Sequence, residues 1–124
     1  MAERNALIAV AAFFVVAIVL VSMLGYLYVQ KKQNEEIVLY YGYSCPHCKV
    51  VEQFINDNNL TARFDIIQRE VMNNTGNYIE FQGVAKTCRI PLNNLMVPVI
   101  ASDGRCYQGQ DESIAFLQAR MNSG

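Results

Sequence analysis

Residues 37–48, IVLYYGYSCPHC, form the most informative stretch of the chain. The run from Ile37 to Tyr41 is continuously apolar and of strand length, which predicts a buried β-strand. Residues 43–46 interrupt that run, and proline is favoured in the first turn of a helix because its missing N–H is not needed there. The stretch therefore predicts a strand, a turn and a helix that begins at Pro46.

Cys45 and Cys48 form a C-x-x-C pair at the start of this predicted helix. The first turn of a helix has unpaired N–H groups and a partial positive charge, which stabilise a thiolate on Cys45. Cys48 is one turn along, close enough to close a disulfide and to resolve a mixed disulfide. His47 adds a hydrogen-bond donor or a cation between them. We expect both features to lower the pKa of Cys45, which stabilises the reduced form and makes the disulfide form a stronger oxidant.

A zinc site is the main alternative for these cysteines, because C-x-x-C is also a zinc half-site. A second half-site is missing from the sequence, since Cys88 and Cys106 each stand alone and His47 is the only histidine. We therefore expect a redox pair and no resident metal. A non-catalytic module that holds a peptide, or a copper or zinc ion, without turnover is the competing hypothesis.

Alternating elements follow the first strand and helix. Residues 62–67 alternate with a period of two, which predicts a second strand. Asp103 and Gly104 predict a tight hairpin, because this dipeptide supplies the positive φ that such turns need. The order is therefore β-α-β-α-β-β-α. The remaining predicted elements are a helix at 77–87, strands at 97–101 and 105–108, and a last helix with Asp111 as its N-cap.

The N-terminal part of the chain has a different composition. Residues 6–29 are apolar except for Ser22 and Gly25, and at about 1.5 Å per residue they span roughly 36 Å, more than a hydrocarbon core of about 30 Å. A cleaved secretory signal has a shorter apolar core. We therefore predict an uncleaved transmembrane helix. The predicted organisation is a flank at 1–5, this helix at 6–29, a linker at 30–35 and a domain at 36–124.

Composition and charge limit the function further. The chain has 124 residues, of which 52% are hydrophobic, and this excludes an intrinsically disordered protein. Residues 35–124 carry seven basic and ten acidic side chains, so their net charge of −3 argues against a nucleic-acid partner.

Two observations bear on the side of the membrane. Flanking charges at Arg4, Lys31 and Lys32 slightly favour a cytoplasmic domain. An even count of four cysteines favours an oxidising compartment. Together with the C-P-H-C motif, the cysteine count leads us to expect a single-pass membrane protein whose domain is extracytoplasmic.

From about residue 36 to 121 the sequence resembles the thioredoxin-fold superfamily of glutaredoxins and thiol-disulfide oxidoreductases. Cys45-Pro46-His47-Cys48 has the form seen in bacterial periplasmic disulfide oxidases, whereas the element order and size are similar to those of glutaredoxins. Val97-Pro98-Val99 matches the family's cis-proline segment. Gly109-Gln110-Asp111 stands where glutaredoxins have two glycines and then acidic residues that hold glutathione.

The resemblance implies an α/β, thioredoxin-like fold with a four-stranded mixed sheet, preceded here by one transmembrane helix. It also implies disulfide exchange with protein thiols and an unidentified redox partner, and it admits glutathione as a co-substrate. No other cofactor is expected. The implied site residues are Cys45 as nucleophile, Cys48 as resolving thiol, His47 beside them, and Tyr43, Val97, Pro98, Gly109 and Asp111 around the substrate.

Cys88 and Cys106 lie in elements that this fold could bring together. We expect a structural disulfide between them, worth about 3 kcal/mol in the chain-entropy model. Two buried free thiols and an accessory redox pair are the alternatives.

Overall fold

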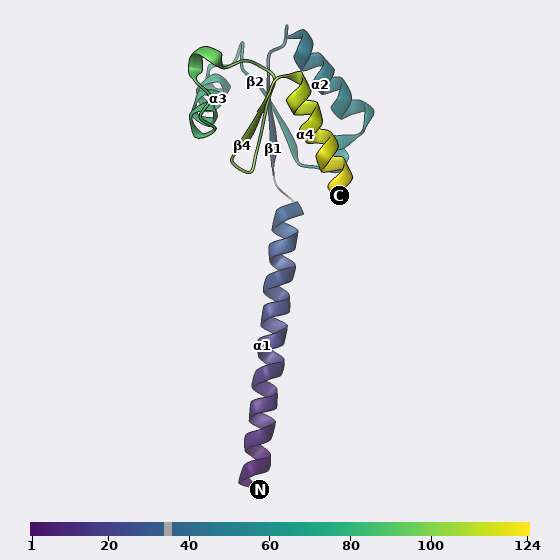
Figure 1. Ribbon diagram of the computed structural model, residues 1–124, viewed down its shortest axis with the longest axis vertical. Coiled ribbons are helices and arrows are strands. Elements are labelled where there is room, and N and C mark those ends of the chain that lie inside the picture. The colour runs from purple at the N-terminus through teal and green to yellow at the C-terminus, as the bar shows by residue number, and fades with distance from the viewer. Residues whose placement is uncertain (34–35) are drawn as a thin grey trace. The chain divides into compact units, whose positions relative to one another are not determined.

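The computed structural model describes residues 1–33 and 36–124. It divides into two compact units, Met1–Asn34 and Glu35–Gly124. Figure 1 labels the elements along the chain. In chain order they are α1 (Ala2–Gln33), β1 (Ile37–Tyr41), α2 (Pro46–Asp57), the 3-10 turn η1 (Leu60–Ala62), β2 (Ile66–Glu70), α3 (Thr75–Thr87), η2 (Leu92–Asn94), β3 (Val99–Ser102), β4 (Arg105–Gln108) and α4 (Gln110–Ser123).

The first unit is a single helix, α1. Its segment Ala2–Val29 is long and apolar enough to cross a membrane, with a mean hydropathy of 3.1 over its most apolar part. The helix is longer than the apolar stretch 6–29, because glutamate, arginine, lysine and glutamine are good helix formers and the polar flanks continue the same backbone. The expected linker 30–35 is thus helical as far as Gln33, and residues 34 and 35 lie outside the described residues.

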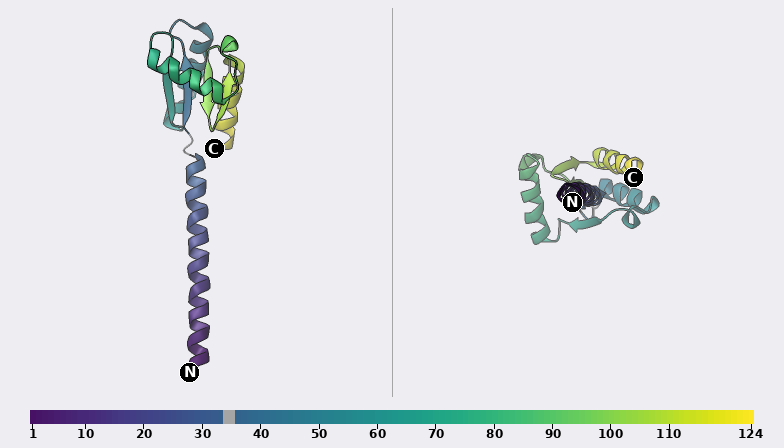
Figure 2. Two further views of the ribbon diagram at one scale, coloured as in Figure 1. Left: turned by 90° about the vertical axis from the view of Figure 1, so that its left-hand side faces the viewer. Right: turned by 90° about the horizontal axis from the view of Figure 1, so that it is seen from below.

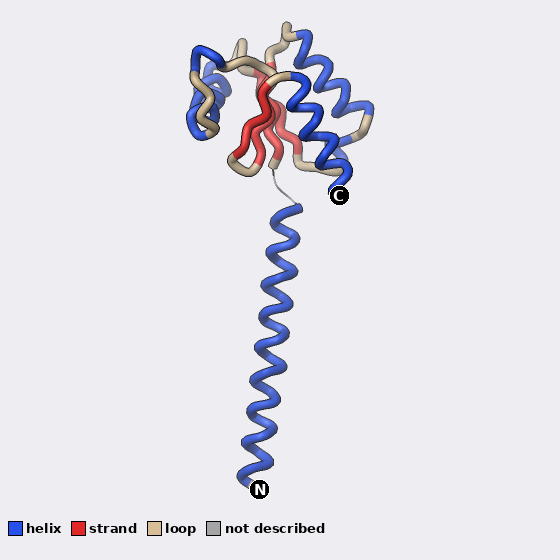
Figure 3. The backbone as a smooth tube through the Cα atoms, viewed as in Figure 1, coloured by secondary structure: helices blue, strands red, loops and turns tan. Residues whose placement is uncertain are grey.

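The second unit is built on a mixed sheet with the strand order β2-β1-β3-β4. β1 is parallel to β2 and antiparallel to β3, and β3 is antiparallel to β4. Figure 3 shows these strands gathered in one sheet, and Figures 1 and 2 show α2 and α4 on one face with α3 on the other. The four-stranded mixed sheet predicted from the sequence is confirmed.

Strand β1 is apolar at every position because both faces of the sheet are covered. Successive side chains of a strand point to opposite faces. Ile37 and Leu39 pack with α2 and α4, whereas Tyr40 packs with Phe81 of α3. An uninterrupted apolar run is typical of a strand buried on both sides. The core on the α2 and α4 face consists of Ile37, Leu39, Val51, Ile55, Leu60, Ile100 and Leu117.

The second strand begins later than the sequence predicts. Residues 60–62 form η1, and β2 covers Ile66–Glu70 instead of 62–67. Leu60 is fully buried in the core, and the Phe64 amide donates to its carbonyl oxygen at 2.9 Å. Residues 62–65 therefore belong to the end of η1 and the turn that leads into β2, and Leu60 packs in the core with side chains of α2 and α4.

The predicted hairpin is confirmed, since Asp103 and Gly104 have φ values of 51° and 71°. The last helix, however, starts at Gln110 and has Gly109, at φ 92°, as its N-cap in place of Asp111. The Glu112 carboxylate accepts a hydrogen bond from the Gln108 amide at 2.9 Å and so provides a partner for a backbone N–H group just before α4. Asp111 instead lies exposed in the first turn, where its negative charge suits the helix dipole.

Candidate active site

Cys45 is the N-cap residue of α2, and its backbone is extended at φ −86° and ψ 114°. The Cys48 amide donates to Cys45 Sγ at 3.2 Å, and a disulfide joins the two residues, whose Cα atoms are 5.2 Å apart. Cys48 is fully buried, whereas Cys45 is partly exposed. An incoming thiolate can therefore reach Cys45 but not Cys48.

The turn before Cys45 depends on Gly42. The Cys45 amide donates to the Gly42 carbonyl at 3.1 Å, which brings the cysteine back over the end of β1. A Cβ at Gly42 would overlap the side chain of Met72, so a larger residue there would require Met72 to move. Ser44 adds a weak contact, since its hydroxyl donates to Met72 Sδ at 3.7 Å.

The segment before β3 lies against the reactive sulfur. The Val97–Pro98 peptide bond is cis, and the Val97 carbonyl oxygen is 3.8 Å from Cys45 Sγ. Pro98 is buried, and its carbonyl oxygen accepts from the Gly109 amide at 2.8 Å. The structure thus brings Cys45, Val97, Pro98 and Gly109 into one neighbourhood, although they are far apart in the sequence.

His47 points to the start of α4. Its Nδ1 atom lies 3.0 Å from Oε1 of Gln110. From the sequence, Gln110 is only the middle residue of the segment Gly109-Gln110-Asp111, and its side chain is assigned no role of its own. Because 63 positions separate the two residues, no local pattern reveals this contact.

Two clefts flank Val97. One has a volume of about 630 Å³ and a mixed lining that includes His47, Pro98, Gln110 and Asp111. The other is apolar, has a volume of about 560 Å³, and includes Val71, Met72, Tyr78, Phe81 and Met96. Met72 and Met96 are 58% and 63% exposed. Methionine side chains are flexible and adapt to apolar partners of different shapes. Tyr43 is also exposed, next to Cys45 in the chain, and lines neither cleft.

Glu70 holds the backbone that carries Met72. Desolvation raises the pKa of Glu70, but hydrogen bonds from backbone amides, those of Asn73 and Met72 foremost, outweigh it and lower the pKa below its usual value. These two bonds measure 2.8 and 2.9 Å. The ionised carboxylate therefore stabilises the turn on which Met72 approaches Gly42.

Cys88 and Cys106 form a second disulfide at the other end of the sheet. Cys88 is the C-cap of α3 and Cys106 lies in β4, with their Cα atoms 5.9 Å apart. Cys106 is opposite Ala101, which in turn is opposite Val38. Val38 precedes Tyr41 by three residues, or about 10 Å of strand, and Cys45 lies beyond Tyr41. The two cysteine pairs are therefore separate.

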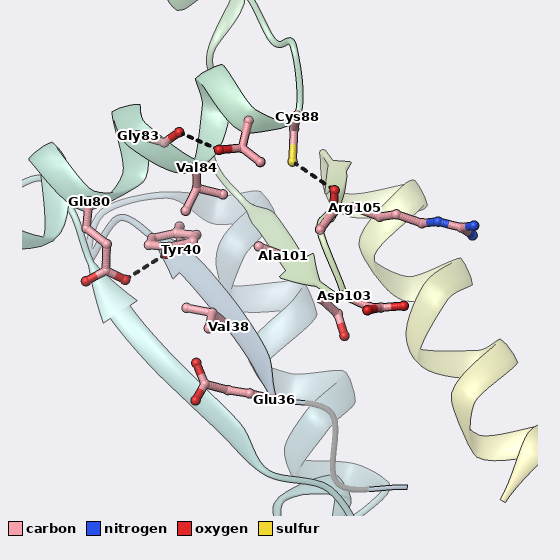
Figure 4. A pocket seen from close by; sticks show the side chains of 13 residues that line it. Glu36, Val38, Tyr40, Glu80, Gly83, Val84, Cys88, Ala101, Asp103 and Arg105 are labelled. Atoms are coloured by element: carbon pink, nitrogen blue, oxygen red, sulfur yellow. Dashed lines mark hydrogen bonds between the residues drawn. The ribbon is translucent and has the colours of Figure 1, made fainter. Parts of the chain in front are cut away.

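A cavity of about 620 Å³ adjoins this second disulfide between α3 and the sheet. Figure 4 shows Tyr40 directed toward Glu80 within it. The Tyr40 hydroxyl donates to Glu80 Oε1 at 2.7 Å, and Arg69 Nε is 3.8 Å from the same oxygen. Burial first, and then the hydrogen bond to Glu80, raise the pKa of Tyr40 well above its usual value. This network joins α3 to the sheet and lies away from Cys45.

Within residues 1–33 and 36–124, no group of three or more histidine, cysteine, aspartate or glutamate side chains is arranged to hold a metal ion.

The sheet order, the helices on its two faces and the cysteine pair after β1 define a thioredoxin-like fold with a dithiol site. Among solved structures, the chain is similar to glutaredoxin 1 from Francisella tularensis in complex with cacodylate, at 20% identity over 71% of this chain and 98% of that one, with a TM-score of 0.47. It is also similar to oxidised glutaredoxin 2 from Chlamydomonas reinhardtii, at 18% identity over 77% and 81% of the two chains, again with a TM-score of 0.47. No protein-family model and no curated protein matches the chain. The function of the chain is therefore inferred from the chemistry of its own site.

Proposed function

We propose that the chain is a membrane-anchored thiol-disulfide oxidoreductase that exchanges disulfides with protein thiols through Cys45 and Cys48. One observation carries this proposal: Cys45 is a partly exposed sulfur at a helix N-terminus that already accepts the Cys48 amide at 3.2 Å. An amide donor and the helix dipole both stabilise a thiolate. Cys45 is thus suited to be the attacking and leaving sulfur, with Cys48 as its buried partner.

The exchange transfers two electrons in two steps. A substrate thiolate attacks Cys45 Sγ, a bond forms between these sulfurs, and the Cys45–Cys48 bond breaks with Cys48 leaving as a thiolate. A second substrate thiolate then attacks the substrate sulfur of the mixed disulfide and releases Cys45 as a thiolate. The substrate dithiol is oxidised to a disulfide, the cysteine pair is reduced, and two protons are released or kept by the thiols. The reverse sequence reduces a substrate disulfide.

The surroundings of Cys45 support a polypeptide as the substrate. The Val97 carbonyl beside the sulfur offers an acceptor to an extended backbone, and exposed apolar side chains at Tyr43 and Met72 offer contact area. Gly109 and Asp111 are proposed to contact the substrate from the cleft that they line with His47, and glutathione is a smaller candidate thiol for this cleft.

Membrane anchoring through residues 6–29, with the domain outside the cytoplasm, completes the proposal. The length and apolar character of α1 support the anchor. The Cys88–Cys106 disulfide supports the location, because such bonds persist in oxidising compartments. We would test the side by reducing intact cells and labelling Cys45 with an impermeant maleimide. Labelling only after the cells are broken open would overturn an extracytoplasmic domain.

The activity is tested with insulin reduction and with oxidation of a reduced, unfolded protein. We expect turnover by the wild type, loss of turnover in Cys45→Ser, and accumulation of a mixed disulfide in Cys48→Ser. The double variant Cys88→Ala/Cys106→Ala should keep the activity at a temperature where it is folded. Equal rates for the wild type and Cys45→Ser would refute disulfide exchange through this cysteine pair. Tight peptide, copper or zinc binding without turnover would favour the non-catalytic module instead.

A further inference from the structure

A closed series of contacts includes Cys45. It joins the starts of α2, β3 and α4, three segments that are distant in the sequence. Cys45 Sγ lies 3.8 Å from the Val97 carbonyl oxygen, and the next residue, Pro98, accepts a hydrogen bond from the Gly109 amide at 2.8 Å. It closes from Gln110 Oε1 to His47 Nδ1 at 3.0 Å, and His47 is two residues from Cys45. His47 and Val97 line the same cleft, and the Val97 carbonyl oxygen is the atom that lies 3.8 Å from Cys45 Sγ.

The contact with Gln110 bears on which nitrogen of the His47 imidazole carries the proton. With Oε1 of Gln110 facing the imidazole, as in this structure, the contact is a hydrogen bond when His47 Nδ1 carries a proton, because an amide oxygen only accepts. In the neutral ring, Nε2 is then left as the atom that accepts a proton. His47 is otherwise exposed, and an exposed side chain without a partner samples several rotamers. The contact with Gln110 thus favours one position of the imidazole and, with Oε1 facing it, the tautomer that has the proton on Nδ1.

We propose that Gln110 is a positioning residue that holds the His47 imidazole beside Cys45, with the proton on Nδ1, for disulfide exchange. This inference rests on the proposed function, because the position of the ring matters only if the cysteine pair turns over. When Nε2 also carries a proton the imidazole is a cation, and a cation held in one place attracts the Cys45 thiolate at one distance, whereas a rotating ring spends part of its time farther away.

Other charged groups share the cleft and must stay unchanged in the test. Asp111 and Glu112 also line it, and the Glu112 carboxylate is bound by the Gln108 amide at 2.9 Å. A neutral replacement of Gln110 leaves both carboxylates in place. Gln110→Met is therefore the informative variant, since it keeps the length of the side chain and removes only the polar end.

The experiment compares the full chain, in detergent, with Gln110→Met and with the matched control Gln118→Met, an exposed glutamine of the same helix. Nitrogen-15 NMR of the His47 ring reports the tautomer. We expect an Nδ1–H ring in the wild type and the control, and loss of that preference in Gln110→Met. For kcat/KM in disulfide exchange we expect a loss of about threefold to tenfold in Gln110→Met, which corresponds to the net value of one hydrogen bond. We also expect the apparent pKa of the Cys45 thiol to rise.

A double-mutant cycle separates this role from a general effect on α4. If Gln110 acts through His47, Gln110→Met has no further effect on kcat/KM or on the thiol pKa in a His47→Ala background. Equal losses in both backgrounds would overturn the proposal, and so would an Nε2–H ring in the wild type. Activity that disappears in Cys45→Ser but is unchanged in Gln110→Met would leave the oxidoreductase standing and refute only the role of Gln110. Wild-type turnover no higher than that of Cys45→Ser would refute both.

Discussion

Removal of the Cys88–Cys106 disulfide should destabilise the domain without disabling its chemistry. The double variant Cys88→Ala/Cys106→Ala removes the bridge between the end of α3 and β4. Both positions are partly exposed, so alanine leaves no large closed cavity there. The main expected effect is a larger conformational entropy of the unfolded chain.

The magnitude follows from the length of the loop that the bridge closes. The two cysteines are 18 positions apart, and the chain-entropy model then gives about 3 kcal/mol at 25 °C. For a domain of this size, each kcal/mol corresponds to about 4 to 8 °C in melting temperature, so we expect a decrease of about 12 to 24 °C. The Cys45–Cys48 bridge spans only three positions, and its removal should cost about half as much by the same relation.

Thermal unfolding of the full chain in detergent would measure this effect. Near-ultraviolet circular dichroism is a suitable signal, because Tyr40 stacks on Phe81 and Tyr107 stacks on Phe116, with ring centroids 4.9 and 4.3 Å apart. This signal follows the packed domain and is little affected by the helical content of α1. The double variant of the other cysteine pair is the matched control.

Two results would refute the reasoning. One is a change in unfolding free energy below about 1 kcal/mol, because the bridge would then not restrict the unfolded chain as the model requires. The other is alkylation of Cys88 and Cys106 in the native, unreduced protein, because the bridge would then be absent.

Three further predictions concern the core and the titrating groups. Leu117→Ala should cost about 2 to 5 kcal/mol in urea unfolding, because this leucine is fully buried in the core beside α2; a cost below about 1 kcal/mol would contradict that packing. Tyr40→Phe should cost about 1 kcal/mol at neutral pH through loss of the bond to Glu80. Because the pKa of Tyr40 is raised in the fold, its contribution is complete below the unfolded value of about 10 and is lost above it, so the variant should show a smaller loss of stability at alkaline pH. The pKa of Glu70 is lowered in the fold, so its contribution to stability is present above the unfolded value of 4.5 and is lost as the pH falls through the folded value. The stability of Glu70→Gln should therefore depend less on pH in that range than the stability of the wild type. An unchanged pH profile would count against the hydrogen bonds from the backbone amides to Glu70.

The sequence predicts the elements around Cys45 well because their signals are local. Ile37–Tyr41 is apolar throughout and Pro46 marks the next helix start, so β1 and α2 agree with expectation. The predicted start of the second strand at residue 62 was wrong, because the Arg63 and Phe64 amides donate to the Leu60 carbonyl in a turn that an alternating pattern does not reveal.

The candidate site shows the same division. The C-x-x-C motif and the Val97–Pro98 segment are visible in the sequence, whereas the contact between His47 and Gln110 arises only when the starts of α2 and α4 converge. Asp111 was assigned as the helix N-cap because aspartate is a favoured capping residue, but the chain uses a positive φ at Gly109 instead.

The strand order has a consequence for solubility. β2 and β4 lie at the two edges of the sheet, where unpaired backbone groups could pair with another molecule. β4 has only four residues and begins with Arg105, and β2 ends in Arg69 and Glu70. Short and charged edge strands discourage such pairing. When many copies are crowded together, these edges should keep neighbouring domains from joining into a continuous sheet.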